Sequence, residues 1–113
     1  MGLLIDGKWH TDWYDTAPSG GEFIRQDSQF RSQLTPQSSG ELYGAEKDRY
    51  HLFVSLACPW AHRTLIFRTL KKLESIIGVP IVEPKMLENG WEIMQQSPIA
   101  NIRYLYEVYT QAQ

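Results

Sequence analysis

Cys58 is the only cysteine of the chain, and its position predicts nucleophilic chemistry. A strand-like run, residues 50–54, precedes it, and a helix-like run begins directly after it at Pro59. At such a junction the helix N-terminus presents free N–H groups and partial positive charge to the sulfur, and both favour thiolate over thiol. Proline suits the first helical position, because an N–H there has no partner within the helix. We therefore predict that Cys58 is a reactive thiol.

The chain offers no second thiol for a redox cycle within the same molecule. In a C-x-x-C pair the partner would stand three residues after Cys58, where the sequence has Ala61. A resolving thiol must then come from outside, and glutathione is the natural donor. A buried structural cysteine is the alternative, since free cysteines are often buried. The strand–Cys-Pro–helix context favours the reactive interpretation.

Composition excludes several classes of function. The chain has 113 residues, enough for one small domain at most, and a net charge of −2, which gives no electrostatic case for nucleic-acid binding. No apolar run approaches the roughly 18 residues that a membrane span needs. A lone cysteine rules out an intrachain disulfide framework and fits a reducing compartment. His10 and His51 have no metal-ligand spacing with Cys58, so we expect no metal. These features predict a soluble, cytoplasmic protein with no nucleic-acid or membrane partner.

The elements around Cys58 follow from hydrophobic periodicity and turn residues. The spacing predicts a strand, a helix and a second strand, which together form a parallel βαβ unit. The helix should present one apolar face, formed by Ala61, Leu65, Ile66, Leu70 and Leu73, and Gly78 should end the helical region. The remaining expected elements are a strand and turn over residues 3–9, a helical turn over 30–34, a strand over 79–82, a turn at 89–90 and an amphipathic helix over 99–112.

Other polar and aromatic residues have a structural interpretation that we prefer. His62 lies one helical turn beyond Cys58 and could stabilise a thiolate, but a partly exposed first-turn histidine is the commoner case. Arg63 could attract anionic glutathione or simply be a solvated helix residue. Tyr104, Tyr106 and Tyr109 resemble a pocket stripe, yet at helical spacing such residues more often belong to a core.

Five strings of the sequence are distinctive: Asp6–Trp9 (DGKW), Trp13–Thr16 (WYDT), Ala45–Leu52 (AEKDRYHL), Ser55–Arg63 (SLACPWAHR) and Leu87–Trp91 (LENGW). Together they resemble the glutathionyl-hydroquinone reductases, an omega-like, xi-class branch of the glutathione transferase superfamily. The resemblance extends over about the first 91 residues, and its specificity comes from the cysteine string combined with the later Asn-Gly-Trp string.

The resemblance implies a thioredoxin-like domain, a homodimer and a glutathione-dependent reduction. By position, Cys58 matches the nucleophile that attacks the glutathionyl sulfur of a glutathionylated aromatic substrate. Trp91 matches the aromatic residue that packs on glutathione, and Pro59 and Trp60 are assigned to the same glutathione site. Without the family, Trp91 is equally well interpreted as a core or loop-anchoring tryptophan.

The resemblance also implies a protein a few times longer than this chain. We therefore expect a truncated member: an incomplete thioredoxin-like α/β domain, without the family's C-terminal all-helical domain. Residues 1–46 would form an N-terminal extension and residues 47–113 the partial domain. Two other functions stay open, a non-catalytic remnant of such an enzyme and a simple glutaredoxin-like thiol transferase. We also expect marginal folding, because an incomplete domain buries too little surface to outweigh conformational entropy.

Overall fold

A computed structural model describes residues 2–24, 27–36, 40 and 42–112. The described residues form two compact units, one from residues within 1–13 and 48–113 and the other from residues 14–47. Residues 2–13 thus belong to the same unit as Cys58. The division into an extension over residues 1–46 and a partial domain over residues 47–113 stays a prediction.

The chain begins with a β-hairpin, as its first residues predict. Strand β1 (Leu3–Ile5) pairs antiparallel with β2 (Lys8–His10). The two residues between the strands have positive φ angles, 47° at Asp6 and 71° at Gly7. This is the pattern of a two-residue type I′ turn, whose twist matches that of the flanking strands.

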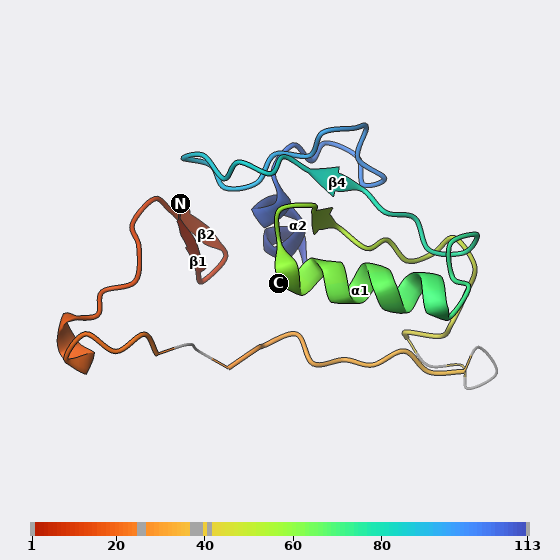
Figure 1. Cartoon of the computed structure of the whole chain (residues 1–113), viewed down its shortest axis with the longest axis horizontal. Coiled ribbons are helices and arrows are strands. Elements are labelled where there is room, and N and C mark those ends of the chain that lie inside the picture. Colours follow the sequence, from red (N-terminus) through yellow and green to blue (C-terminus); the bar gives the residue numbers. More distant parts are fainter. Residues whose placement is uncertain (1, 25–26, 37–39, 41, 113) are drawn as a thin grey trace. The chain divides into compact units, whose positions relative to one another are not determined.

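A parallel βαβ unit follows, and it confirms the predicted arrangement around Cys58. Strand β3 (Val54–Ser55) leads into helix α1 (Pro59–Leu70), and β4 (Ile81–Val82) returns beside β3. Figure 1 shows α1 running alongside the two strands. The strands are shorter than expected: Leu56 is in a turn and exposed, and the earlier residue His51 contributes only an isolated bridge to Gly78.

Helix α1 ends several residues before Gly78, where the sequence suggested its end. Lys71 caps the helix and Lys72 adopts a left-handed φ of 55°. The Arg68 guanidinium stabilises the turn beyond this end, since its Nε donates to the Ile77 carbonyl at 2.8 Å and Nη2 donates to the Glu74 carbonyl at 3.0 Å. The Arg68 side chain, from the last turn of α1, therefore stabilises the chain reversal for which the sequence suggested Gly78.

The second helix, α2 (Leu105–Gln111), is half as long as the helix predicted over residues 99–112. Residues 99–101 instead form a bend and a turn, in which Asn101 has a left-handed φ of 60°, and the backbone of residues 103–105 pairs with the segment that precedes it. The Ile93 N–H donates to the Arg103 carbonyl at 2.9 Å, and the Leu105 N–H donates to the Trp91 carbonyl at 2.9 Å. Helical periodicity in residues 99–104 was therefore overridden by tertiary pairing.

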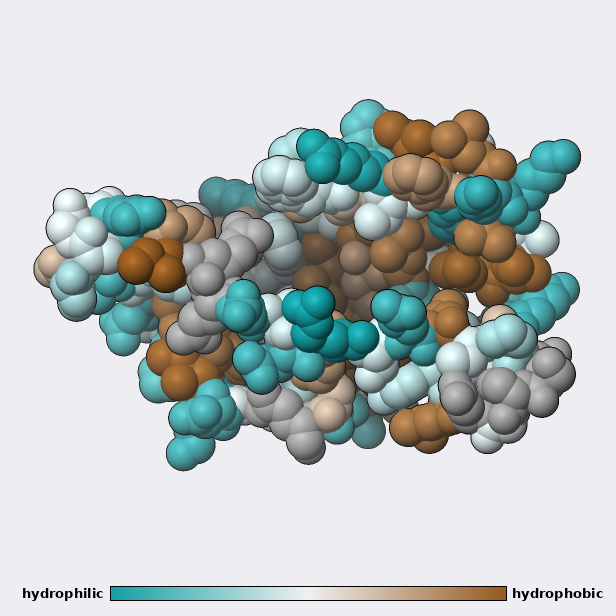
Figure 2. All heavy atoms as spheres, turned by 90° about the horizontal axis from the view of Figure 1, so that it is seen from below, coloured by the Kyte–Doolittle hydropathy of each residue, from teal (hydrophilic) through white to brown (hydrophobic). Residues whose placement is uncertain are grey.

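The apolar core of the described residues is small. Val54, Val82, Ile93 and Ile102 are buried. Of the expected apolar face of α1, Ala61, Leu65 and Leu73 are half-buried, but Ile66 is 46% and Leu70 is 69% exposed, so that part of the prediction is wrong. Figure 2 shows hydrophobic side chains reaching the surface.

The second unit, residues 14–47, contains little regular structure among its described residues. A 3₁₀ turn, η1 (Ala17–Ser19), ends at Gly20 with a left-handed φ of 67°. Tyr14 and Phe23 make an edge-to-face ring contact at 4.8 Å. The helical turn predicted over residues 30–34 is absent there, so that prediction is wrong.

Candidate active site

Cys58 is the N-cap residue of α1, with an extended backbone (φ −91°, ψ 114°). Its N–H donates to the Ser55 carbonyl at 3.0 Å, and its carbonyl accepts the His62 N–H at 3.2 Å. The residue is free and half-buried, and no side chain caps this end of the helix. A residue in this place stands at the positive end of a three-turn helix dipole.

The residues after Cys58 include an exposed aromatic ring with a cation over it. Pro59 occupies the first helical position, as predicted. Trp60 is 65% exposed, and the Arg63 guanidinium lies over its ring at 4.7 Å from the centroid. His62 is exposed. An exposed ring backed by a guanidinium can contact a flat or anionic ligand.

Trp91 lies directly after the predicted tight turn. Leu87 and Gly90 exchange backbone hydrogen bonds at 3.3 and 3.1 Å, and Gly90 has a left-handed φ of 76°. The Trp91 ring is half-buried and packs against the core of Val82, Ile93 and Ile102. Trp91 therefore has the core contact of a loop-anchoring tryptophan and is still partly exposed, and its contact with glutathione stays a prediction.

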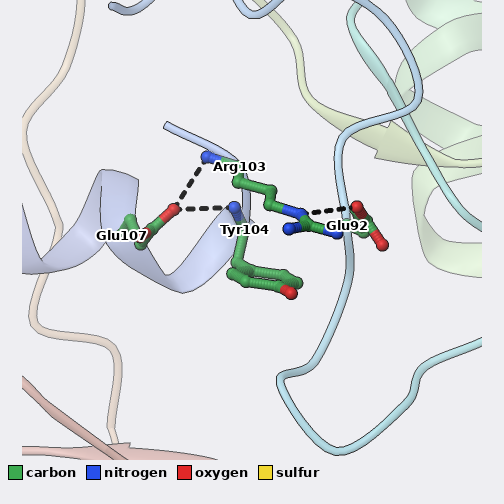
Figure 3. Close-up of polar contacts among 4 residues, drawn as sticks. All are labelled: Glu92, Arg103, Tyr104 and Glu107. Atoms are coloured by element: carbon green, nitrogen blue, oxygen red, sulfur yellow. Dashed lines mark hydrogen bonds and ion pairs between the residues drawn. The ribbon is translucent and has the colours of Figure 1, made fainter. Parts of the chain in front are cut away.

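Glu92, the residue after Trp91, is joined to the segment that leads into α2 (Figure 3). Arg103 Nε donates to Glu92 Oε1 at 2.7 Å, and this partner raises the pKa of Arg103 above its ordinary value. The Glu107 carboxylate accepts the backbone N–H groups of Arg103 at 2.8 Å and Tyr104 at 2.7 Å. A carboxylate there satisfies N–H groups that have no helical partner and complements the helix dipole.

Trp9 is a member of this region that sequence reasoning did not select. Its indole Nε1–H donates to the Glu88 carbonyl at 3.0 Å, although the two residues are 79 positions apart. Its ring stacks on Tyr106 at 5.0 Å with an interplanar angle of 15°, and Tyr106 in turn stacks on Tyr104 at 6.0 Å. The available signal was that the aromatic residues of this region follow neither a helical nor a strand period. The ring of such a residue usually docks on another part of the fold.

The structure brings some of the predicted site residues together and not others. Cys58, Pro59 and Trp60 are adjacent at the start of α1, whereas Trp91 belongs to the region contacted by α2. Among the described residues, no cluster of three or more His, Cys, Asp or Glu side chains is arranged to hold a metal ion. Within the same described ranges, neither helix has the length and apolar character required to cross a bilayer.

No family model matches the chain. Individual proteins do match: glutathionyl-hydroquinone reductase YqjG of Escherichia coli strain K12 is 52% identical over 124 residues, covering 99% of this chain and 38% of the relative. Glutathionyl-hydroquinone reductase PcpF of Sphingobium chlorophenolicum is 48% identical, with 99% of this chain and 36% of that protein covered. The chain thus spans little more than a third of the length of these curated relatives.

Solved structures give the same result for the fold. A Xi class glutathione transferase from Natrialba magadii superposes with a TM-score of 0.80 and 41% identity, over 99% of this chain and 36% of that chain. A glutathione-bound structure of YqjG from Escherichia coli K-12 superposes with a TM-score of 0.68 and 43% identity, over 97% of this chain and 33% of that chain.

The α/β fold, the cysteine at the start of α1 and these similarities define the class as a glutathione transferase of the Xi type, with an incomplete thioredoxin-like domain. Within that class, the chain belongs to the glutathionyl-hydroquinone reductase family.

Proposed function

We propose that this chain carries the nucleophile of a glutathione-dependent thiol transferase that reduces glutathionyl-hydroquinones. The observation that carries the proposal is the half-buried, free thiol of Cys58 at the N-cap of α1. The names of the relatives YqjG and PcpF support the substrate class, and the glutathione-bound structure of YqjG supports the co-substrate.

The proposed reaction has two exchange steps. The Cys58 thiolate attacks the sulfur of the glutathionyl thioether, a Cys58–glutathione disulfide forms, and the carbon–sulfur bond breaks. The aromatic carbon keeps the electron pair and takes a proton from solvent, which releases the hydroquinone. A second glutathione thiolate then attacks the glutathione sulfur of the mixed disulfide, so that oxidised glutathione leaves and the Cys58 thiolate is restored.

Other residues contribute binding in this proposal. Trp60 and Trp91 offer partly exposed rings to glutathione, and a rigid ring gives contact area at low entropic cost. Pro59 removes one N–H that would have no partner within the helix, and its ring fixes the φ angle of the residue that follows Cys58. The proposed chemistry involves no metal.

The setting of this chemistry is part of the proposal. We propose a cytoplasmic protein, because a lone free cysteine fits a reducing compartment. We also propose a homodimer and a domain division at residue 46, both of which rest on the family resemblance. Size-exclusion chromatography with light scattering tests the homodimer, and a single monomeric mass at micromolar concentration would contradict it.

One observation favours a second candidate, a non-catalytic remnant that associates with another chain. Large apolar side chains of α1 are exposed, among them Phe67 at 62% and Leu70 at 69%. Exposed apolar surface of this kind favours association. The remnant would show no turnover with any glutathionylated substrate.

A Cys58→Ser variant tests the catalytic proposal. We expect wild-type chain to release hydroquinone from a glutathionyl-hydroquinone in the presence of glutathione, and the variant to lose turnover by at least about a hundredfold, because a hydroxyl does not form the mixed disulfide. Ala57→Ser is the matched control, since it places the same side chain at the neighbouring exposed residue and leaves the thiol in place.

The substrates separate the three candidates. Activity on the aromatic thioether that is lost in Cys58→Ser and kept in Ala57→Ser supports the reductase. Activity on a small glutathione mixed disulfide, with none on the thioether, identifies a glutaredoxin-like thiol transferase. Retained turnover in Cys58→Ser contradicts Cys58 as the nucleophile, and a wild-type chain without turnover on either substrate supports the remnant.

A further inference from the structure

The turn before Trp91 is held in place by the N-terminal hairpin. Trp9 of β2 donates its indole N–H to the Glu88 carbonyl at 3.0 Å, inside the turn that Leu87 and Gly90 close. The ring lies so close to Gly90 that a Cβ on that residue would be 3.0 Å from the indole. We call Trp9, Glu88, Gly90 and Tyr106 the Trp9 cluster.

The indole ring also contacts α2. Trp9 stacks on Tyr106 at 5.0 Å, and α2 is bonded to the residue after the turn through the Leu105 N–H and the Trp91 carbonyl, at 2.9 Å. A second bond joins hairpin and helix, because Thr110 Oγ1 donates to the Gly7 carbonyl at 3.2 Å. The Trp9 ring therefore contacts both the turn that precedes Trp91 and the helix α2, which is itself bonded to the Trp91 carbonyl. The positions of these two segments determine the position of Trp91.

We propose that Trp9 is a positioning residue for glutathione: it fixes the Asn89–Trp91 loop so that Trp91 and the loop backbone can bind the tripeptide. This inference rests on the proposed function. Trp9 itself is not a catalytic residue, because its ring is committed to Tyr106 and its N–H to Glu88.

Indole chemistry explains why a tryptophan is needed at this place. Its N–H fixes the Glu88 carbonyl, while its large ring fills the space against Gly90 and stacks on Tyr106. Phenylalanine supplies a ring without a donor, and leucine supplies neither a donor nor an aromatic face. The two substitutions therefore separate the hydrogen bond from the stacking.

The experiment titrates glutathione into isotope-labelled chains and follows the amide signals of Asn89, Gly90 and Trp91. We expect saturable shifts in the wild type, an approximately fivefold higher Kd in Trp9→Phe and a larger increase in Trp9→Leu, as one hydrogen bond and then the ring contact are lost. Trp13→Phe is the control tryptophan substitution, and its Kd should equal that of the wild type. The rate of Cys58 alkylation should be the same in the wild type and in Trp9→Phe. A general loss of structure in the variant would change this rate.

Amide hydrogen exchange tests one step of the inference, the holding of the loop by Trp9, separately from the proposed function. The Gly90 N–H, which donates to the Leu87 carbonyl, should exchange faster in Trp9→Phe than in the wild type. Wild-type glutathione binding with the same Kd in both Trp9 variants would overturn the inference and leave the proposed function intact. If glutathione shifts no wild-type signal, the proposed function fails. The positioning role is then supported by faster Gly90 exchange and overturned by unchanged exchange.

Discussion

Gly90 shows how one missing side chain determines the shape of a loop. Its left-handed φ of 76° disfavours any other residue, and a Cβ would approach the Trp9 ring to 3.0 Å. We predict that Gly90→Ala lowers the free energy of unfolding by about 2 kcal/mol, from backbone strain together with the ring contact. Urea unfolding followed by circular dichroism measures this change.

A double-mutant cycle separates the two causes. In a Trp9→Leu background the ring is gone, so Gly90→Ala should cost only the backbone strain, about 1 kcal/mol. Equal costs in both backgrounds would mean that the alanine methyl does not meet the indole.

Glu107 makes a second residue-scale prediction, because its carboxylate accepts two backbone N–H groups at the start of α2 (Figure 3). Glu107→Gln removes the charge but keeps an oxygen that can accept these bonds, so the weakened cap should cost about 0.5 kcal/mol of stability. The measurement is the urea midpoint together with amide exchange at Arg103 and Tyr104. Glu88→Gln is the control, since the Glu88 side chain is exposed and only its backbone carbonyl takes part in the Trp9 cluster.

At the scale of elements, the βαβ unit has a buried side and an exposed side. Val82 of β4 is fully buried, whereas Leu70 of α1 is 69% exposed. We predict that Val82→Ala lowers the unfolding free energy by about 2 kcal/mol and that Leu70→Ala changes it by less than about 0.5 kcal/mol. The comparison uses urea unfolding of both variants at one protein concentration. A costly Leu70→Ala would indicate that another copy covers α1 in solution.

The same elements show which features the sequence was sufficient to predict. Features that depend on neighbouring residues were predicted correctly. These are the Asp6–Gly7 and Asn89–Gly90 turns, Pro59 at the first helical position and the parallel strands. Tertiary contacts decided the rest. Residues 99–104 have helical spacing, but residues 99–101 form a bend and a turn and residues 103–105 pair with residues 91–93. Arg68 rather than Gly78 shapes the turn after α1.

The candidate site divides in the same way. Cys58 was found because its chemistry depends on its immediate neighbours. Trp9 was missed because its role depends on Glu88 and Tyr106, which only the folded chain brings near it. Contacts between residues so far apart in the sequence, such as Trp9 with Glu88 and Tyr106, leave no periodic pattern in a single sequence.

For the whole molecule, the small core predicts weak stability. The described residues bury few apolar side chains and leave many large ones exposed. We predict that thermal unfolding of the chain is broad and centred below about 60 °C, followed by circular dichroism and calorimetry. A sharp, cooperative transition above that temperature would contradict this expectation. Repeating the scan over a tenfold range of protein concentration would show whether association supplies the stability.

The bond between Trp9 and Glu88 has a consequence for the order of events during synthesis. The ribosome releases the hairpin first, but the partners of Trp9 are the carbonyl of residue 88 and the ring of residue 106. A two-stranded hairpin alone is marginal in water. The hairpin must therefore wait, exposed to chaperones and proteases, until residue 106 has left the exit tunnel.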